Sequence, residues 1–133
     1  MALDYSSGAE ADFAKLDLAD PEAHDIVLVF LEEADADPKL INRFTTHGDG
    51  ALGEWRFNIK RWEATRGEAN LYRIRVLDSP ATDYRVVYGY DWRQRRVCVL
   101  AVVHKELFDY EPSSELGDRI LKDWREYTGG RKT

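Results

Sequence analysis

The spacing of hydrophobic residues divides the chain into a helical part and a sheet part. Within residues 20–50, two segments begin with the same pair, at Asp20-Pro21 and at Asp37-Pro38. Aspartate caps the first free N–H groups of a helix and proline fits the first helical position, so each pair predicts a helix start. The β-branched run at 26–31 is also typical of a strand, but the cap before it and Glu32-Glu33-Ala34 after it favour a helix.

The segment after the first predicted helix and the segment before it are expected to differ in structure. The second helix has an apolar stripe of Leu40, Ile41 and Phe44, and it ends in the turn-forming string His47-Gly48-Asp49-Gly50. Residues 1–19 hold few large apolar residues and many small or acidic ones. We therefore expect residues 1–19 to be loosely ordered, ahead of a single domain at 20–133.

From residue 54 onwards apolar and polar residues alternate, which is the period of a β-strand. The expected strands lie within residues 54–104 and cover 54–60, 71–77, 84–90 and 96–103. The last strand is apolar almost throughout, as in a strand that is buried on both faces. A capped, amphipathic segment at 113–127 predicts a C-terminal helix. Two helices, about four strands and one helix predict an α+β domain with a small antiparallel sheet.

Charge is unevenly distributed along the chain. Residues 1–54 carry a net charge of −10, residues 55–105 carry +6, and residues 106–133 carry −2, within a total of −6. A basic segment inside an acidic chain is typical of a protein with an anionic partner. Alternatively, the acidic and basic parts neutralise each other within one fold.

Cysteine content and hydropathy indicate the compartment. Cys98 is the only cysteine and lies in the apolar run 97–100, which favours a buried hydrophobic residue over a nucleophile. The start of the chain lacks the features of a signal peptide, and the longest apolar stretch, Ile26–Leu31, is too short to span a membrane. We expect a reduced cytoplasmic protein without membrane contact.

Basic residues on the expected strands are the first candidates for chemistry. Arg73 and Arg75 are two residues apart, so they project from one face of their strand, and the apolar residues at 72, 74 and 76 take the other. Arg85 begins the next strand close to the same edge. Guanidinium groups held on a rigid sheet suit phosphate recognition. The alternative is that these charges only solvate the outer face of the sheet.

The end of the last strand adds titratable groups. His104-Lys105 follows the apolar run, and Tyr110 comes a few residues later. An imidazole beside an ammonium at a strand end could act as a general acid or base, or bind a phosphate. His24 and His47 have no partners in the sequence pattern, and no group of His, Asp and Glu has metal-ligand spacing. The sequence therefore predicts no metal site and no cofactor.

Three consecutive motifs resemble the core of the RelE/ParE superfamily of toxins. They are LYRIRV at 71–76, DYRVVYGYD at 83–91 and VCVLAVVHKELFDYE at 97–111. In that family a strand with two basic residues precedes a Tyr-Arg strand and an apolar strand that ends in a basic residue or histidine. The resemblance covers about residues 55–127. Family members usually begin with a strand, so here either an early strand lies within Ala11–Leu18 or the topology is permuted.

The resemblance implies the toxin of a type II toxin–antitoxin system, and it favours an enzyme that cleaves mRNA on the ribosome. In such endoribonucleases the RNA 2′-hydroxyl attacks its own phosphate without a metal ion, so positioning and charge stabilisation suffice. Carried onto this chain, the substrate-binding residues would be Lys60, Arg73 and Arg75, and the catalytic residues Arg85, His104, Lys105 and Tyr110. The implied partners are a cognate antitoxin, the ribosome and mRNA.

Two other functions remain open on the sequence alone. Gyrase-inhibiting members of the superfamily share the fold without the nuclease residues, and the sequence pI near 5.1 is low for a protein that binds RNA. In the other alternative the chain is an inactive or repurposed binding module. Its acidic first 54 residues would then cover the basic face from within the same chain.

Overall fold

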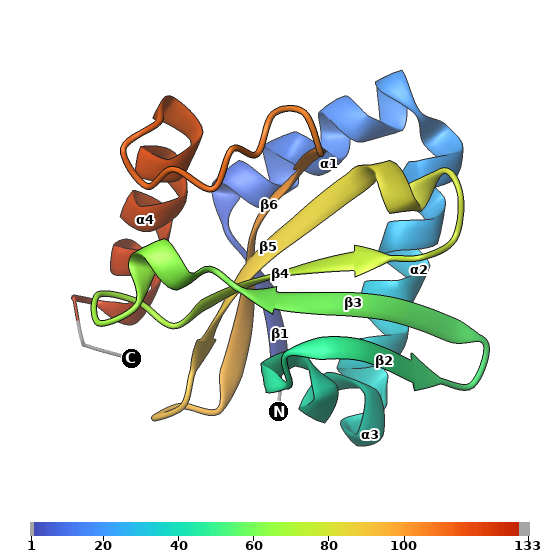
Figure 1. Cartoon of the computed structure of the whole chain (residues 1–133), viewed down its shortest axis with the longest axis horizontal. Helices are drawn as coiled ribbons and strands as arrows, with labels where there is room; N and C mark the ends of the chain where they lie inside the picture. Colours follow the sequence, from blue (N-terminus) through green and yellow to red (C-terminus); the bar gives the residue numbers. More distant parts are fainter. Residues whose placement is uncertain (1, 131–133) are drawn as a thin grey trace.

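A six-stranded sheet in the order β1-β6-β5-β4-β3-β2 forms the centre of the molecule (Figure 1), here a computed structural model that describes residues 2–130. The strands are β1 (Ala2–Tyr5), β2 (Gly48–Leu52), β3 (Trp55–Arg61), β4 (Leu71–Val76), β5 (Tyr84–Asp91) and β6 (Arg96–His104). The helices of the described residues are α1 (Ser7–Ala19), α2 (Pro21–Ala36), α3 (Pro38–Ile41) and α4 (Glu115–Thr128). The α+β class and the C-terminal helix are confirmed, but the sheet has six strands instead of about four.

The sheet is mixed and not purely antiparallel. Strands β2 to β6 pair in antiparallel fashion, whereas β1 pairs with β6 in parallel, with Leu3 opposite Val97. Parallel neighbours need a crossover connection, and the whole chain between β1 and β6 supplies it. The sheet therefore joins the first residues of the chain to its last strand.

Both predicted Asp-Pro helix starts are confirmed. The Asp20 side chain accepts a hydrogen bond from the Ala23 N–H at 3.1 Å, and the Asp37 side chain accepts one from the Lys39 N–H at 2.9 Å. The first of the two predicted helices is α2, which includes the β-branched run at 26–31 and buries Phe30 and Leu31 completely. The second consists of α3 and a 3₁₀ turn at Asn42–Thr45.

Residues 2–19 are ordered as β1 and α1, so the expectation of a loose N-terminal segment is wrong. The Ser6 side chain caps α1 by accepting a hydrogen bond from the Ala9 N–H at 3.1 Å. The helix buries Ala9, Phe13 and Leu16, which follow helical spacing although only two of them are large. It also occupies the range Ala11–Leu18, so the N-terminal strand is β1 and lies earlier than expected.

The glycine-rich segment after α3 is a strand and not a turn. Gly50 of β2 pairs with Phe57 of β3, and a Cβ at Gly50 would lie 2.2 Å from the Phe57 ring. An aromatic side chain thus fills the space that a larger residue at Gly50 would need. The glycines that suggested a turn are compatible with a strand because of this cross-strand contact.

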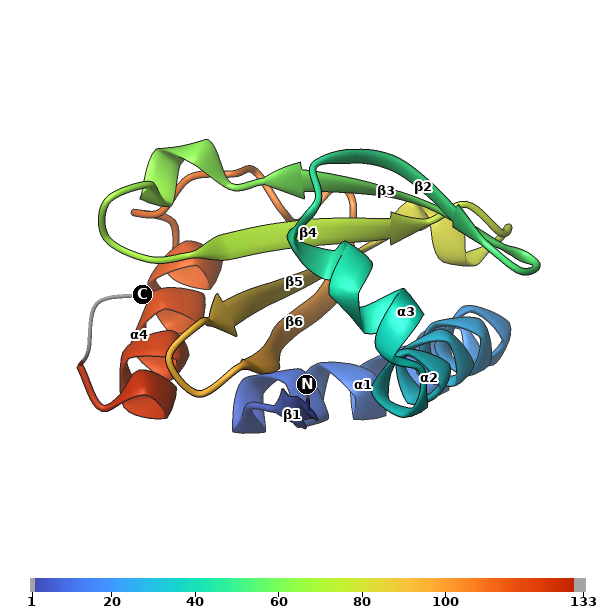
Figure 2. The same cartoon turned by 90° about the horizontal axis from the view of Figure 1, so that it is seen from below.

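Two hydrophobic clusters lie on opposite faces of the sheet. One is between the sheet and α1–α3 and includes Phe30, Phe44 and Phe57, and the other is under α4 and includes Leu100 and Trp124. Figure 2 shows α1 and α2 below the sheet, with α4 at its left-hand end. Because α4 covers only that end, the rest of its face of β3–β5 carries no helix. Among the described residues, no helix has both the length and the apolar character needed to cross a membrane.

Strand β6 is longer than β1, so part of its outer edge has no strand partner within residues 2–130. Polar side chains form hydrogen bonds with the backbone groups of that part. The Asp12 carboxylate accepts a hydrogen bond from the Val102 N–H at 3.0 Å. The Arg119 guanidinium donates to the Leu100 carbonyl at 2.9 Å and forms an ion pair with Asp12 at 2.9 Å. An exposed strand edge is a template for pairing with other chains, and α1 and α4 close this one with an ion pair between a buried Asp12 and a partly exposed Arg119.

Candidate functional site

Basic side chains gather on the part of the sheet that α4 leaves open. Tyr72, Ile74 and Val76 belong to the core under α1–α3, so the alternating residues Arg73 and Arg75 project from the opposite face, as predicted. Lys60 of β3 pairs with Arg73, and Arg85 of β5 directly precedes Val86, which pairs with Ile74. We refer to these four cations and the nearby Tyr110 as the basic face; its members are Lys60, Arg73, Arg75, Arg85 and Tyr110.

Arg73 is the structural centre of the basic face. Its side chain is only 8% exposed. Its Nε donates a hydrogen bond to the Tyr110 hydroxyl at 2.9 Å, and its Nη1 donates to the side-chain and main-chain oxygens of Asn58 at 2.7 and 3.0 Å. The Asn58 amide in turn donates to Asp49 at 2.7 Å. A guanidinium held this firmly positions its neighbours more than it offers a free fork to a ligand.

Tyr110 is fixed at its backbone, its ring and its hydroxyl. Its φ of 60° is in the left-handed region, which is unfavourable for a bulky residue. The Tyr110 carbonyl accepts a hydrogen bond from the Trp62 indole at 2.9 Å, and its ring lies 4.4 Å from that of Phe108, between centroids. The Lys60 ammonium lies 5.5 Å from the centre of the same ring. Strained residues held by several contacts are frequent at functional sites.

The cations of the basic face have no carboxylate partners. Within residues 2–130, no ion pair involves any of the four, and the buried Nε of Arg75 has no hydrogen-bond partner. Burial lowers the pKa of Arg85, and the charges of Arg73 and Arg75 lower it further, while Tyr110 acts in the opposite direction. Like charges that face each other across strands are destabilising. A bound anion would relieve this repulsion.

His104 does not join the basic face. It pairs with Tyr84 across β5 and β6, with ring centroids 5.4 Å apart, while Arg85 projects from the other face of β5. The His104 Nδ1 accepts a hydrogen bond from the Glu106 N–H at 3.2 Å. Its side chain lines a separate cavity of about 710 Å³ between α1 and α4. The expectation that His104 acts together with Tyr110 is therefore not supported by the geometry.

Lys105 is neutralised locally. Its ammonium forms an ion pair with Asp83 at 3.2 Å, and its N–H donates to the Asp83 carbonyl at 2.8 Å. Both side chains are about half exposed. A lysine that already has a carboxylate partner is a weaker candidate for phosphate contact than Arg75 or Arg85.

The acidic N-terminal helices lie away from the basic face. Helices α1 and α2 pack on the other side of the sheet, over the cluster that contains Phe13, Val27 and Phe30. The hypothesis that the first 54 residues cover the cations within one chain is therefore wrong. The sheet separates the charges of these helices from the basic face, and the two parts meet elsewhere in an ion pair between Asp4 and Arg96 at 2.7 Å.

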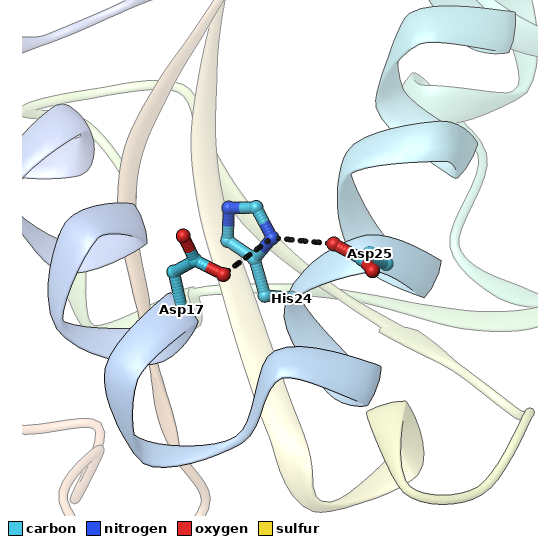
Figure 3. Close-up of side chains that lie close together, drawn as sticks. All are labelled: Asp17, His24 and Asp25. Atoms are coloured by element: carbon cyan, nitrogen blue, oxygen red, sulfur yellow. Dashed lines mark hydrogen bonds and ion pairs between the residues drawn. The ribbon is translucent and has the colours of Figure 1, made fainter.

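A second polar cluster joins the end of α1 to the start of α2 (Figure 3). The His24 Nδ1 lies 2.9 Å from an Asp25 oxygen and 3.7 Å from an Asp17 oxygen, so the expectation that His24 lacks partners is wrong. One ligand atom from each of the three residues lies within 4.8 Å of the others, close enough to share a metal ion. Both carboxylates approach the same nitrogen and both are largely exposed, as in a polar contact on the surface.

The sequence did not single out the residues that support Arg73 and Tyr110. Asn58 is one of the polar residues that alternate along β3, and that pattern could have indicated its face; Trp62 gave no such signal.

Comparisons of the chain with protein-family models, curated proteins and solved structures gave no match. The function is therefore argued from the basic face.

Proposed function

We propose that the chain binds RNA through its basic face and is the toxin of a type II toxin–antitoxin system that cleaves mRNA on the ribosome. The observation that carries the proposal is the Tyr110 hydroxyl, which accepts a hydrogen bond from the buried Arg73 among cations that have no carboxylate partner in residues 2–130. This arrangement joins a proton-transfer group to a preformed anion site. The resemblance to RelE/ParE toxins supplies the substrate and the setting.

The proposed reaction is an attack of the RNA 2′-hydroxyl on the adjacent phosphorus. The bond from phosphorus to the 5′ oxygen breaks, leaving a 2′,3′-cyclic phosphate and a free 5′-hydroxyl. Arg75 and Arg85 stabilise the charge that develops on the phosphate oxygens. Tyr110 supplies a proton to the departing 5′ oxygen while the attacking hydroxyl loses its proton to solvent.

The remaining residues have supporting roles in this proposal. Arg73 orients the Tyr110 hydroxyl, and Asn58 orients Arg73. Lys60 is exposed above the Tyr110 ring and attracts the RNA backbone. His104 and Lys105 have no part in proton transfer, because the first faces the other side of the sheet and the second is paired with Asp83.

Cleavage is tested with purified protein, ribosomes and end-labelled mRNA. The wild-type chain is expected to cut the mRNA and leave a 2′,3′-cyclic phosphate. Tyr110→Phe is expected to slow cleavage about 100-fold through loss of proton transfer. Arg85→Gln should slow it about 100-fold through loss of charge stabilisation. His104→Ala is the control and should change the rate by no more than about twofold.

Two outcomes would contradict the proposal. If the wild-type chain arrests growth but leaves mRNA intact on ribosomes, the activity is not RNA cleavage, and a gyrase supercoiling assay becomes the next measurement. If His104→Ala abolishes cleavage while Tyr110→Phe retains it, the basic face is not the catalytic site. Thermal denaturation of each variant shows that a lost activity does not reflect a lost fold.

A further inference from the structure

The turn between β5 and β6 carries an exposed aromatic residue among cations. It consists of residues 92–95, Trp-Arg-Gln-Arg, at the end of a long hairpin (Figure 1). The Trp92 side chain is 54% exposed, whereas Trp62 and Trp124 are buried in the core. The Arg93 guanidinium lies 5.2 Å from the centre of the Trp92 ring. The indole therefore presents an exposed flat face beside a cation.

The two arginines of this turn have no ion-pair partners in the part of the chain that the structure describes. Arg96, the next residue along the chain, differs because it forms an ion pair with Asp4 at 2.7 Å. Arg93 and Arg95 are both exposed. The turn therefore presents two uncompensated positive charges next to a flat aromatic surface.

The backbone of the turn adds an independent observation. Arg95 has a φ of 54°, in the left-handed region that glycine adopts freely and other residues adopt at a cost. Turns of this kind commonly place glycine or asparagine at such a position. An arginine that is kept there against the backbone preference points to a use for its side chain.

We propose that the hairpin tip, defined as Trp92, Arg93 and Arg95, is a binding site for single-stranded nucleic acid. A base stacks on the Trp92 ring, and the flanking phosphates contact the two guanidiniums. Stacking on an exposed aromatic residue beside cations is the usual mode of sequence-tolerant single-strand binding. The positive charge of the tip complements a polyanion.

The tip is separate from the basic face and extends the proposed function. Arg85 lies near the start of β5 and the tip follows its end at Asp91, so about 20 Å of strand separates them. In combination with the proposed RNA cleavage, the tip would bind the same strand at a distance from the cut. The proposal rests on the proposed function only for the choice of RNA as the ligand.

The test uses the intrinsic fluorescence of Trp92 and an oligouridylate of about 12 nucleotides, within the usual single-strand site size. The oligonucleotide is expected to quench the wild-type emission. Trp92→Phe is expected to remove most of this quenching, because Trp62 and Trp124 are buried and the half-buried Trp55 donates its indole N–H to Glu33. Trp92→Ala should weaken binding of the same oligonucleotide about tenfold.

Arg95→Gly separates a role in binding from a role in folding. Glycine suits the left-handed backbone, so this variant is expected to keep or raise the melting temperature while weakening oligonucleotide binding about threefold through the lost phosphate contact. Arg66→Gln removes the same charge from an exposed arginine that is paired with Glu63, and it should bind like the wild type. Equal affinity of Arg95→Gly and the wild type would overturn the proposal.

The double variant Arg75→Gln/Arg85→Gln distinguishes the tip from the catalytic proposal. It is expected to lose cleavage and keep the quenching of Trp92. If the wild type cleaves mRNA but the oligonucleotide leaves Trp92 emission unchanged, the tip proposal fails and the catalytic one stands. If the oligonucleotide quenches Trp92 but the wild type does not cleave mRNA, the catalytic proposal fails and the tip proposal stands. Quenching by anionic lipid vesicles but not by the oligonucleotide would assign the tip to a membrane surface and overturn the proposal.

Discussion

The Tyr110 hydroxyl depends on a chain of hydrogen bonds that starts at the edge of the sheet. Asp49 accepts from the Asn58 amide, the Asn58 oxygen accepts from Arg73, and Arg73 donates to Tyr110. Because Arg73 is almost fully buried, each acceptor that it loses leaves a charged donor without compensation. A residue that never touches RNA can therefore control the position of the one proposed to donate a proton.

The variant Asn58→Ala tests this dependence. It removes the 2.7 Å acceptor of Arg73, and we expect the free energy of unfolding to fall by about 2 kcal/mol, the range for a hydrogen bond to a charged group. Cleavage should slow while RNA affinity changes little, because Arg75 and Arg85 stay in place. Urea denaturation and single-turnover cleavage provide the two measurements. Asn42→Ala, the same change at an exposed position of the 3₁₀ turn after α3, is the matched control and should alter neither.

At the scale of elements, α4 is placed against the sheet by one small residue. Gly89 of β5 lies directly under Trp124, and a Cβ at Gly89 would be 2.4 Å from the indole ring. Any larger residue at Gly89 would push α4 away from the strands that carry Val87 and Leu100. Since α4 marks the border of the basic face, its docking also limits how far that face extends.

We therefore predict that Gly89→Ala lowers the free energy of unfolding by about 1–3 kcal/mol, the usual effect of overpacking a filled core. Trp124→Leu should be destabilising alone but should partly relieve the effect of Gly89→Ala, because the smaller side chain leaves room for the added methyl group. Thermal denaturation of the two single variants and the double variant measures this coupling. Strictly additive effects would show that the two residues are not in contact.

The elements that the sequence did not predict depend on partners far along the chain. Strand β1 has only four residues, and its assignment requires β6. Strand β2 is rich in glycine, and only the ring of Phe57 opposite Gly50 explains why it is a strand. Helix α1 buries only two large apolar residues, Phe13 and Leu16, so it lacks a strong apolar stripe. The remaining strands and α2 carry their own periodicity and caps, and they were predicted from the sequence.

The residues of the candidate site also fall into two groups, those that a single strand predicts and those that depend on pairing between strands. Alternation along β4 correctly placed Arg73 and Arg75 on one face, and Arg85 was expected only close to the same edge. The face on which His104 lies depends on the register between β5 and β6, and this register contains an irregularity between Val87 and Tyr88. A shift of one residue sends a side chain to the opposite face, so a strand pattern alone cannot place a residue at a strand end.

For the whole molecule, polar contacts join both ends of the chain to β6. Asp4 of β1 accepts hydrogen bonds from Arg96 of β6 and from the Tyr127 hydroxyl of α4. The Arg96 hydrogen bond holds the pKa of Asp4 below its ordinary value, against the effect of burial. Burial and the Asp4 carboxylate raise the pKa of Tyr127, and burial raises the pKa of Tyr5 to about 12.

These shifts predict a stability maximum that declines on both sides. The contribution of Asp4 is present above its unfolded pKa of 3.8 and is lost as the pH falls through the lower folded value. The contributions of the tyrosines are present below their unfolded pKa of 10.0 and are lost as the pH rises towards the folded values. Melting temperatures between about pH 3 and pH 11 should show both declines.

Asp4→Asn is the variant that isolates the acid limb. At neutral pH it should lower the free energy of unfolding by about 1 kcal/mol, as for a partly exposed ion pair with good geometry. It should also flatten the decline below pH 4 relative to the wild type. An unchanged acid limb in Asp4→Asn would mean that other carboxylates account for the acid dependence.

The parallel pairing of β1 with β6 also bears on how the protein is made. Residues in contact at this junction are separated by up to 94 positions, as between Ser6 and Leu100. During synthesis β1 emerges long before β6, and this edge of the sheet cannot close until residues 96–104 have been made. A ribosome that stalls or terminates before Arg96 would release a chain without the strand that joins β1 to β5. Because β6 joins β1 to the strands of the basic face, and Tyr110 follows β6 in the chain, that face is complete only after residue 110 has been made. The timing of translation therefore also sets the moment at which any activity begins.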